Sequence, residues 1–156
     1  MYKVLVCLKS VLEETRNTEG VKDLLERALK LCLEASAIVA DVVNSDSPEG
    51  HLPDAPLHEE EDGGRTAQLL LLCAWRTVKD ASLLMGEICS RCPWLSEHTV
   101  ASLAEHFVQQ LSNITHQGAF EQAYVGFCQV SKKSKQAGWK QKVTQTNDNL
   151  AYFCTR

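Results

Sequence analysis

An apolar run that ends in two cations constrains this chain more than any other feature. Residues 69–74 read Leu-Leu-Leu-Leu-Cys-Ala, which predicts a helix buried on every side. Trp75, Arg76 and Lys79 follow within about one turn, at about 3.6 residues per turn. An unpaired charge away from water is very costly, so a cation here needs a partner. Asp80, four residues beyond Arg76, is the local candidate for that partner.

Apolar residues at helical spacing cover most of the rest of the chain, and no segment predicts a strand. Pro93 is expected to end the central helix, and Ser96 to cap the start of the next one. Short turns between amphipathic helices favour antiparallel neighbours. The sequence therefore predicts an all-α fold with helices at about 2–14, 20–43, 65–91, 97–114 and 119–132.

Two segments lack this periodicity. Residues 44–64 contain three prolines, three glycines and seven acidic residues with no basic one. This composition predicts a flexible linker. The alternative is an acidic strip that repels RNA or docks a basic partner.

Residues 133–156 are predicted to be a basic, disordered tail. Lysines around Trp139 suit single-stranded nucleic acid, but a terminus foreign to the fold would look the same, and that interpretation is favoured. Residues 131–156 carry a net charge of +5 and the remainder about −9, which argues against broad phosphate binding by the helices.

No motif points to catalysis, a cofactor or a metal. Cys89 and Cys92 form a lone C-x-x-C pair, whereas a zinc site needs four ligands, and His98 and His106 lie about two turns apart. The seven cysteines are an odd number and suit reduced thiols in a cytosolic protein. No signal peptide or membrane-length apolar stretch is expected. We expect a cytoplasmic protein that is not an enzyme.

Two blocks carry a family resemblance. The run Leu69–Gly86 resembles the signature helix of the THADA family, and His116–Phe127 resembles that family's downstream His-Arg-Gly-Ala-Phe-Glu element. Gln117 stands where the family usually has Arg. The resemblance covers about residues 1–130 and fades after Val130, where further helices of the family are missing. It therefore implies a truncated fragment of a larger protein.

The resemblance also implies a fold and a function. The expected architecture is an armadillo- or HEAT-like segment of antiparallel helical hairpins: a hairpin at 1–43, the linker at 44–64, a signature repeat segment at 65–132 and the tail at 133–156. The expected function is a non-catalytic scaffold that assists a tRNA 2′-O-methyltransferase subunit at the anticodon loop, with tRNA as a further partner. Because neighbouring repeats are missing, an apolar face is expected to stay open. The alternative is a protein-interaction module, or a non-functional truncated product, without a direct role in RNA modification.

Five residues of the two blocks are the candidate interface for the partner or tRNA: Trp75, Arg76, Lys79, His116 and Glu121. The alternative for the first three is a core tryptophan with two cations whose heads reach the surface. His116 follows a predicted helix C-terminus, where a protonated imidazole would act as a cap. Glu121 is favoured by the dipole at the start of the last helix, or is the buried counter-ion of Arg76 if the third and fifth helices pack together.

Overall fold

Helices are the only regular secondary structure in the described part of the chain. A computed structural model describes residues 2–15, 19–44 and 61–136, and no strand occurs among them. The predicted all-α class is confirmed. The elements are α1 (Tyr2–Glu14), a short 3₁₀ helix η1 (Glu19–Val21), α2 (Lys22–Val43), α3 (Glu61–Arg91), α4 (Glu97–Asn113) and α5 (Gln117–Gln136).

The helix ends agree with the sequence signals at some positions and differ at others. Ser96 caps α4 as predicted, because its Oγ accepts a hydrogen bond of 3.1 Å from the Thr99 N–H. α3 ends at Arg91, just before Pro93. However, α3 begins at Glu61, inside the segment predicted to be a linker, and α5 runs on to Gln136, inside the predicted tail. The rest of the predicted linker and tail lies outside the described residues.

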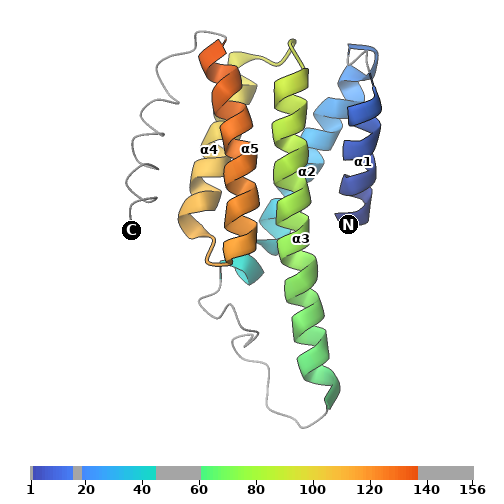
Figure 1. The fold of residues 1–156 in the computed structure, drawn as a ribbon, viewed down its shortest axis with the longest axis vertical. Helices are drawn as coiled ribbons and strands as arrows, with labels where there is room; N and C mark the ends of the chain where they lie inside the picture. The colour runs from blue at the N-terminus through green and yellow to red at the C-terminus, as the bar shows by residue number, and fades with distance from the viewer. Residues whose placement is uncertain (1, 16–18, 45–60, 137–156) are drawn as a thin grey trace.

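The helices form a row with a second layer behind it (Figure 1). α1, α3 and α5 run in the same direction, with α3 in contact with both α1 and α5. α2 and α4 run in the opposite direction, α2 packing on α3 and α4 on α5. Each α-helix is therefore antiparallel to the next one along the chain, as short connections favour for α3 with α4 and for α4 with α5. None of the described helices is long and apolar enough to cross a membrane.

The core lies between the two layers, where each helix turns its apolar stripe inward. A small second cluster at the lower end joins Val43 of α2, Ala74 and Val78 of α3, and Ala119 of α5. The main cluster has members on all five α-helices, including Leu5, Leu12, Leu25, Leu29, Leu84, Met85, Ile88, Leu103, Phe107, Phe127 and Val130.

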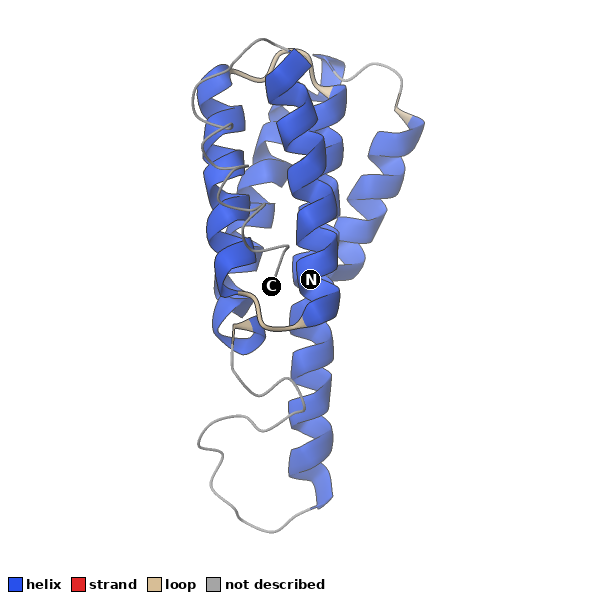
Figure 2. Cartoon of the chain, turned by 60° about the vertical axis from the view of Figure 1, so that its left-hand side comes forward, coloured by secondary structure: helices blue, strands red, loops and turns tan. Residues whose placement is uncertain are grey.

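Two leucines of α3 that the sequence placed in a fully buried run are exposed, which corrects one prediction. Leu69 is 60 % exposed and Leu70 is 45 % exposed, so the expectation of a helix buried on every side is wrong there. The physical reason is visible in Figures 1 and 2, where α3 extends past the ends of the other described helices. Continuous burial of one α3 face begins only at Ala74.

Two glycines let α3 and α5 approach closely. A Cβ added to Gly126 would lie 2.5 Å from the carbonyl oxygen of Ser82 and 2.7 Å from Cζ of Phe107. A Cβ added to Gly86 would lie 3.0 Å from the Cα of Gly126. Glycine costs helix stability, so a glycine inside a helical pattern signals close packing. Gly86 and Gly126 both interrupt helical patterns in the sequence, so the close packing of α3 on α5 left a signal at both positions.

Candidate functional site

The structure brings the two sequence blocks into direct contact. Trp75, on α3, stacks its indole on the imidazole of His116, which lies in the turn between α4 and α5. The ring centroids are 5.5 Å apart and the planes differ by 11°. Trp75 is half-buried and packs against the small apolar cluster around Val43 and Ala119. One side of the ring pair is therefore anchored in the core.

Two cations flank the same indole. Cζ of Arg76 lies 5.9 Å and Nζ of Lys79 lies 6.0 Å from the ring centroid of Trp75. Both residues are half-buried. A cation near an aromatic face is attracted by the ring quadrupole, which offsets part of its lost hydration. We call Trp75, Arg76, Lys79 and His116 the Trp75 cluster.

His116 caps a helix, but at the opposite end from the one predicted. Its Nδ1 accepts a hydrogen bond of 3.2 Å from the Ala119 N–H, and its carbonyl oxygen accepts from the N–H groups of Ala119 and Phe120. α4 already ends at Asn113, so His116 lies at the start of α5. The cap that His116 makes is therefore at a helix start, whereas the sequence hypothesis placed it at a helix C-terminus. The cap holds the imidazole where Trp75 stacks on it.

The two candidate counter-ions of Arg76 lie in different environments. Burial raises the pKa of the Asp80 carboxyl, while the charges of Lys79, Lys9 and Arg76 act in the opposite direction. Asp80 is thus close enough to feel Arg76. Glu121 is exposed, and its Oε1 accepts a hydrogen bond of 3.0 Å from Nε2 of Gln117. An exposed carboxylate does not fit the alternative of a buried counter-ion, so Asp80 is the better candidate.

The cysteine pair is embedded in the core. Cys89 and Cys92 are both buried, and burial raises the pKa of the Cys89 thiol to about 11. A thiol with such a pKa is protonated at neutral pH and is a poor nucleophile. Among residues 2–15, 19–44 and 61–136, no group of three or more His, Cys, Asp or Glu side chains could hold a metal ion.

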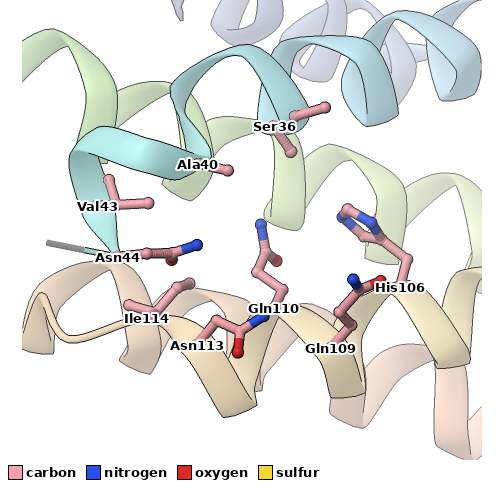
Figure 3. Close-up of a pocket in the computed structure, with 10 residues that line it drawn as sticks. Ser36, Ala40, Val43, Asn44, His106, Gln109, Gln110, Asn113 and Ile114 are labelled. Carbon is pink, nitrogen blue, oxygen red and sulfur yellow. The ribbon is translucent and has the colours of Figure 1, made fainter.

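A groove between α2 and α4 carries no motif that would reveal it in the sequence. Its volume is about 260 Å³ (Figure 3). Four carboxamides on its two walls were the only available sign, and amides on a helix surface are common. The groove is lined by Ser36, Ala37, Ala40, Val43, Asn44, His106, Gln109, Gln110, Asn113 and Ile114.

Comparison with known proteins identifies the family. The family model described as THADA/TRM732, DUF2428 matches residues 23–148, which is more than half of the chain. The chain belongs to this family. The match also runs beyond Val130, so the expectation that the resemblance fades there is wrong, and most of the basic segment after it is family-like rather than foreign.

The curated relatives are far longer than this chain. The Drosophila melanogaster "tRNA (32-2′-O)-methyltransferase regulator THADA" is 32 % identical over 171 aligned residues, which cover 85 % of this chain and 10 % of the relative. The Schizosaccharomyces pombe "tRNA (32-2′-O)-methyltransferase regulator trm732" is 30 % identical over 123 residues, covering 71 % of this chain and 8 % of the relative. The human THADA protein is 35 % identical over 77 residues, which cover 43 % of this chain and 4 % of the human protein. The chain thus spans a tenth or less of these relatives, and no solved structure matches it.

Proposed function

We propose that this chain is a non-catalytic helical segment of a regulator that supports 2′-O-methylation of tRNA position 32 by a separate methyltransferase. The family match carries the proposal, because each of the relatives described above is named as a regulator of that reaction. Under this proposal the chain works in the cytoplasm, supplies a binding surface and needs no cofactor, and the methyltransferase holds the reacting groups.

The Trp75 cluster, together with Glu121, is the proposed contact surface for the methyltransferase or the tRNA. Its support is geometric: two blocks that are 41 positions apart, at Trp75 and His116, form one aromatic pair with two cations beside it. Such a surface suits stacking with one planar group and pairing with an anionic group. The acidic balance of the rest of the described chain favours a local contact over a broad one.

We also propose that the helices belong to an armadillo- or HEAT-like array, with residues 1–43 and 65–132 as its two units. The alternating helix directions support it. So do exposed apolar side chains at both ends of the row, Val4 and Val11 on α1, and Tyr124 and Val125 on α5. In a repeat array, neighbouring repeats cover such faces.

A chimera tests the function. The 156-residue chain replaces the aligned region of the Drosophila relative, and 2′-O-methylation of tRNA position 32 is measured with the methyltransferase. We expect the chimera to support methylation, and Arg76→Ala and Lys79→Ala to lower it about tenfold, the effect of about 1.4 kcal/mol of lost binding. Lys30→Ala is the matched control, because the Lys30 side chain is 79 % exposed on α2, outside the cluster.

Binding assays on the same chimera separate the alternatives. Loss of methyltransferase capture in the Lys79 variant assigns the cluster to the enzyme, and loss of tRNA capture alone assigns it to the RNA. Equal methylation by the Lys79 and Lys30 variants would refute the role of the cluster. A folded chimera that captures neither partner would leave the protein-interaction module as the better description.

A further inference from the structure

One edge of α2 carries an apolar ridge that the core of this chain does not use up. Leu24, Leu31 and Ile38 are spaced by seven residues, which is close to two helical turns, so they share one face of α2. Leu24 is 48 % exposed and Ile38 is 69 % exposed, while Leu31 is half-buried. The neighbouring Leu25 and Leu29 are buried in the core. We call the first three residues the α2 ridge.

A small apolar hollow lies beside one end of the α2 ridge. It lies between α1 and α2 and has a volume of about 30 Å³. Leu24 of the ridge lines it, together with Leu8 and Val11 of α1, and Val11 is itself exposed. None of the described residues that line the hollow is charged. The hollow therefore suits the end of an aliphatic side chain.

Two charges of opposite sign lie along the same edge. Arg27 precedes Leu31 by four residues and Glu34 follows it by three, and both side chains are exposed. Because these two residues are also seven apart, they lie on one side of the ridge. Among the described residues Arg27 has no ion-pair partner, and Glu34 has one in Lys30, at 3.8 Å on the same helix. Arg27 is thus available to a carboxylate from outside.

An antiparallel second copy of α2 matches this edge to itself. Leu24 and Ile38 each lie seven residues from Leu31, so a two-fold axis at Leu31 brings Ile38 of one copy to the level of Leu24 of the other. Ile38 then meets the hollow beside Leu24. The same axis brings Arg27 of each copy to within one residue, about 1.5 Å along the helix, of the level of Glu34 in its partner copy. Two-fold symmetry makes each contact twice.

A parallel arrangement lacks this match. It places Arg27 at the level of the second Arg27, and Glu34 at the level of the second Glu34, and like charges repel. It also brings Ile38 to the second Ile38 and leaves the hollow unfilled. The complementary charges therefore favour the antiparallel arrangement.

We propose that the chain forms a two-fold homodimer through the α2 ridge, with Ile38 of each copy in the hollow of the other and Arg27 paired with Glu34. A contact made mainly by one 22-residue helix is smaller than the roughly 800 Å² per partner of a standard interface. Association is therefore weak, with a dissociation constant on the order of 100 µM. This surface is separate from the Trp75 cluster, and the inference does not rest on the proposed function.

Sedimentation equilibrium of the whole 156-residue chain tests the dimer, over a concentration range of about a hundredfold around that dissociation constant. The average mass should rise from that of one chain to that of two. Ile38→Asp should weaken association at least about tenfold, because a carboxylate in the hollow loses its hydration. Val125→Asp is the matched control, because Val125 is 43 % exposed on α5, away from α2, and it should leave association unchanged.

Two outcomes of this experiment would overturn the proposal. A chain that stays monomeric over the whole range would leave the hollow to a neighbouring repeat instead of a second copy. Association that survives in Ile38→Asp but is lost in Val125→Asp would assign it to α5.

An exchange of charges tests the antiparallel pairing. Arg27→Glu and Glu34→Arg should each weaken association about tenfold, because each places like charges at both symmetric contacts. The double variant restores opposite charges and should associate to within about threefold of the original chain. Circular dichroism verifies the fold of each variant. A double variant as weak as the single ones would refute the pairing, and growth beyond two copies would refute the closed dimer.

Discussion

Two places where helices face each other, α3 with α5 and α2 with α4, differ in how they are filled. Between α3 and α5, Gly86 and Gly126 let the backbones meet, and no space remains for a methyl group at Gly126. Between α2 and α4, the same two-layer arrangement leaves a groove of about 260 Å³ lined by carboxamides. We call the α3–α5 contact, where glycines lack side chains, the closed contact, and the α2–α4 contact, where polar side chains line a groove, the open contact.

The same difference is seen in how the two contacts treat a buried hydroxyl group. Ser82, in the closed contact, is fully buried and donates its hydrogen bond to Gln110. Ser36, in the open contact, is almost as buried but unpaired. A satisfied hydroxyl stabilises a fold by about 1 kcal/mol, whereas an unsatisfied one destabilises it. Substitutions in either contact test whether the two contacts differ in this way.

The largest effect is expected at the closed contact. Gly126→Ala should lower the free energy of unfolding by about 2 kcal/mol, because overpacking typically costs 1–3 kcal/mol and outweighs the gain in helix propensity. The new Cβ would meet the backbone of Ser82, which cannot rotate away. Urea unfolding measures the change. Gly118→Ala is the control, since its Cβ would meet only the His116 side chain at 3.3 Å and should change stability little.

The second prediction contrasts the two serines. Ser82→Ala should cost about 1 kcal/mol, because it leaves Oε1 of Gln110 without its donor. Ser36→Ala should be neutral or slightly stabilising, because it removes a buried oxygen that has no partner. Urea unfolding of both variants gives the comparison. Equal losses would mean that Ser36 is paired in solution and that the two contacts are alike.

Sequence patterns predicted the elements of both contacts but not the difference between them. Periodicity, Pro93 and the Ser96 cap determine where helices begin and end, and these are local properties. The exposure of Leu69 and Leu70 depends instead on how far α3 extends past its neighbours, which no local pattern records. The groove likewise depends on which amides of α4 face α2.

The candidate site was predictable to a similar degree. The sequence singled out the two blocks that hold Trp75 and His116, and their family assignment is now shown, but it did not predict that the two rings stack on each other. The sequence did not predict that His116 caps the start of α5, because only three residues lie between the end of α4 and the start of α5 and the histidine was assigned to the α4 end.

The stability of the fold should depend on pH through His106, which lines the open contact. Burial lowers the pKa of His106 in the folded chain below its unfolded value of about 6.5, so a proton binds the unfolded chain more readily. The stability from neutral His106 is therefore present above about pH 6.5 and is lost as the pH falls below it. Between pH 7 and 5.5, the original chain should lose more stability than His106→Gln, by under about 1 kcal/mol. An equal loss of stability in the original chain and in His106→Gln would show that His106 is solvated in the folded chain.

The smallest effect is expected for Glu121, the carboxylate that the sequence suggested as a distant counter-ion of Arg76. Glu121→Ala should cost under about 0.5 kcal/mol, because an exposed carboxylate with a Gln117 hydrogen bond contributes little. Arg76→Ala should cost about 1 kcal/mol through its contact with the Trp75 ring. The destabilisation of the double variant should equal the sum of the two single effects to within about 0.5 kcal/mol, since Asp80 is the carboxylate whose pKa the Arg76 charge lowers.

A double-mutant cycle of Arg76→Ala with Asp80→Asn is the matched comparison and should show coupling. A coupling above about 1 kcal/mol between Arg76 and Glu121 in urea unfolding would instead make Glu121 the counter-ion of Arg76.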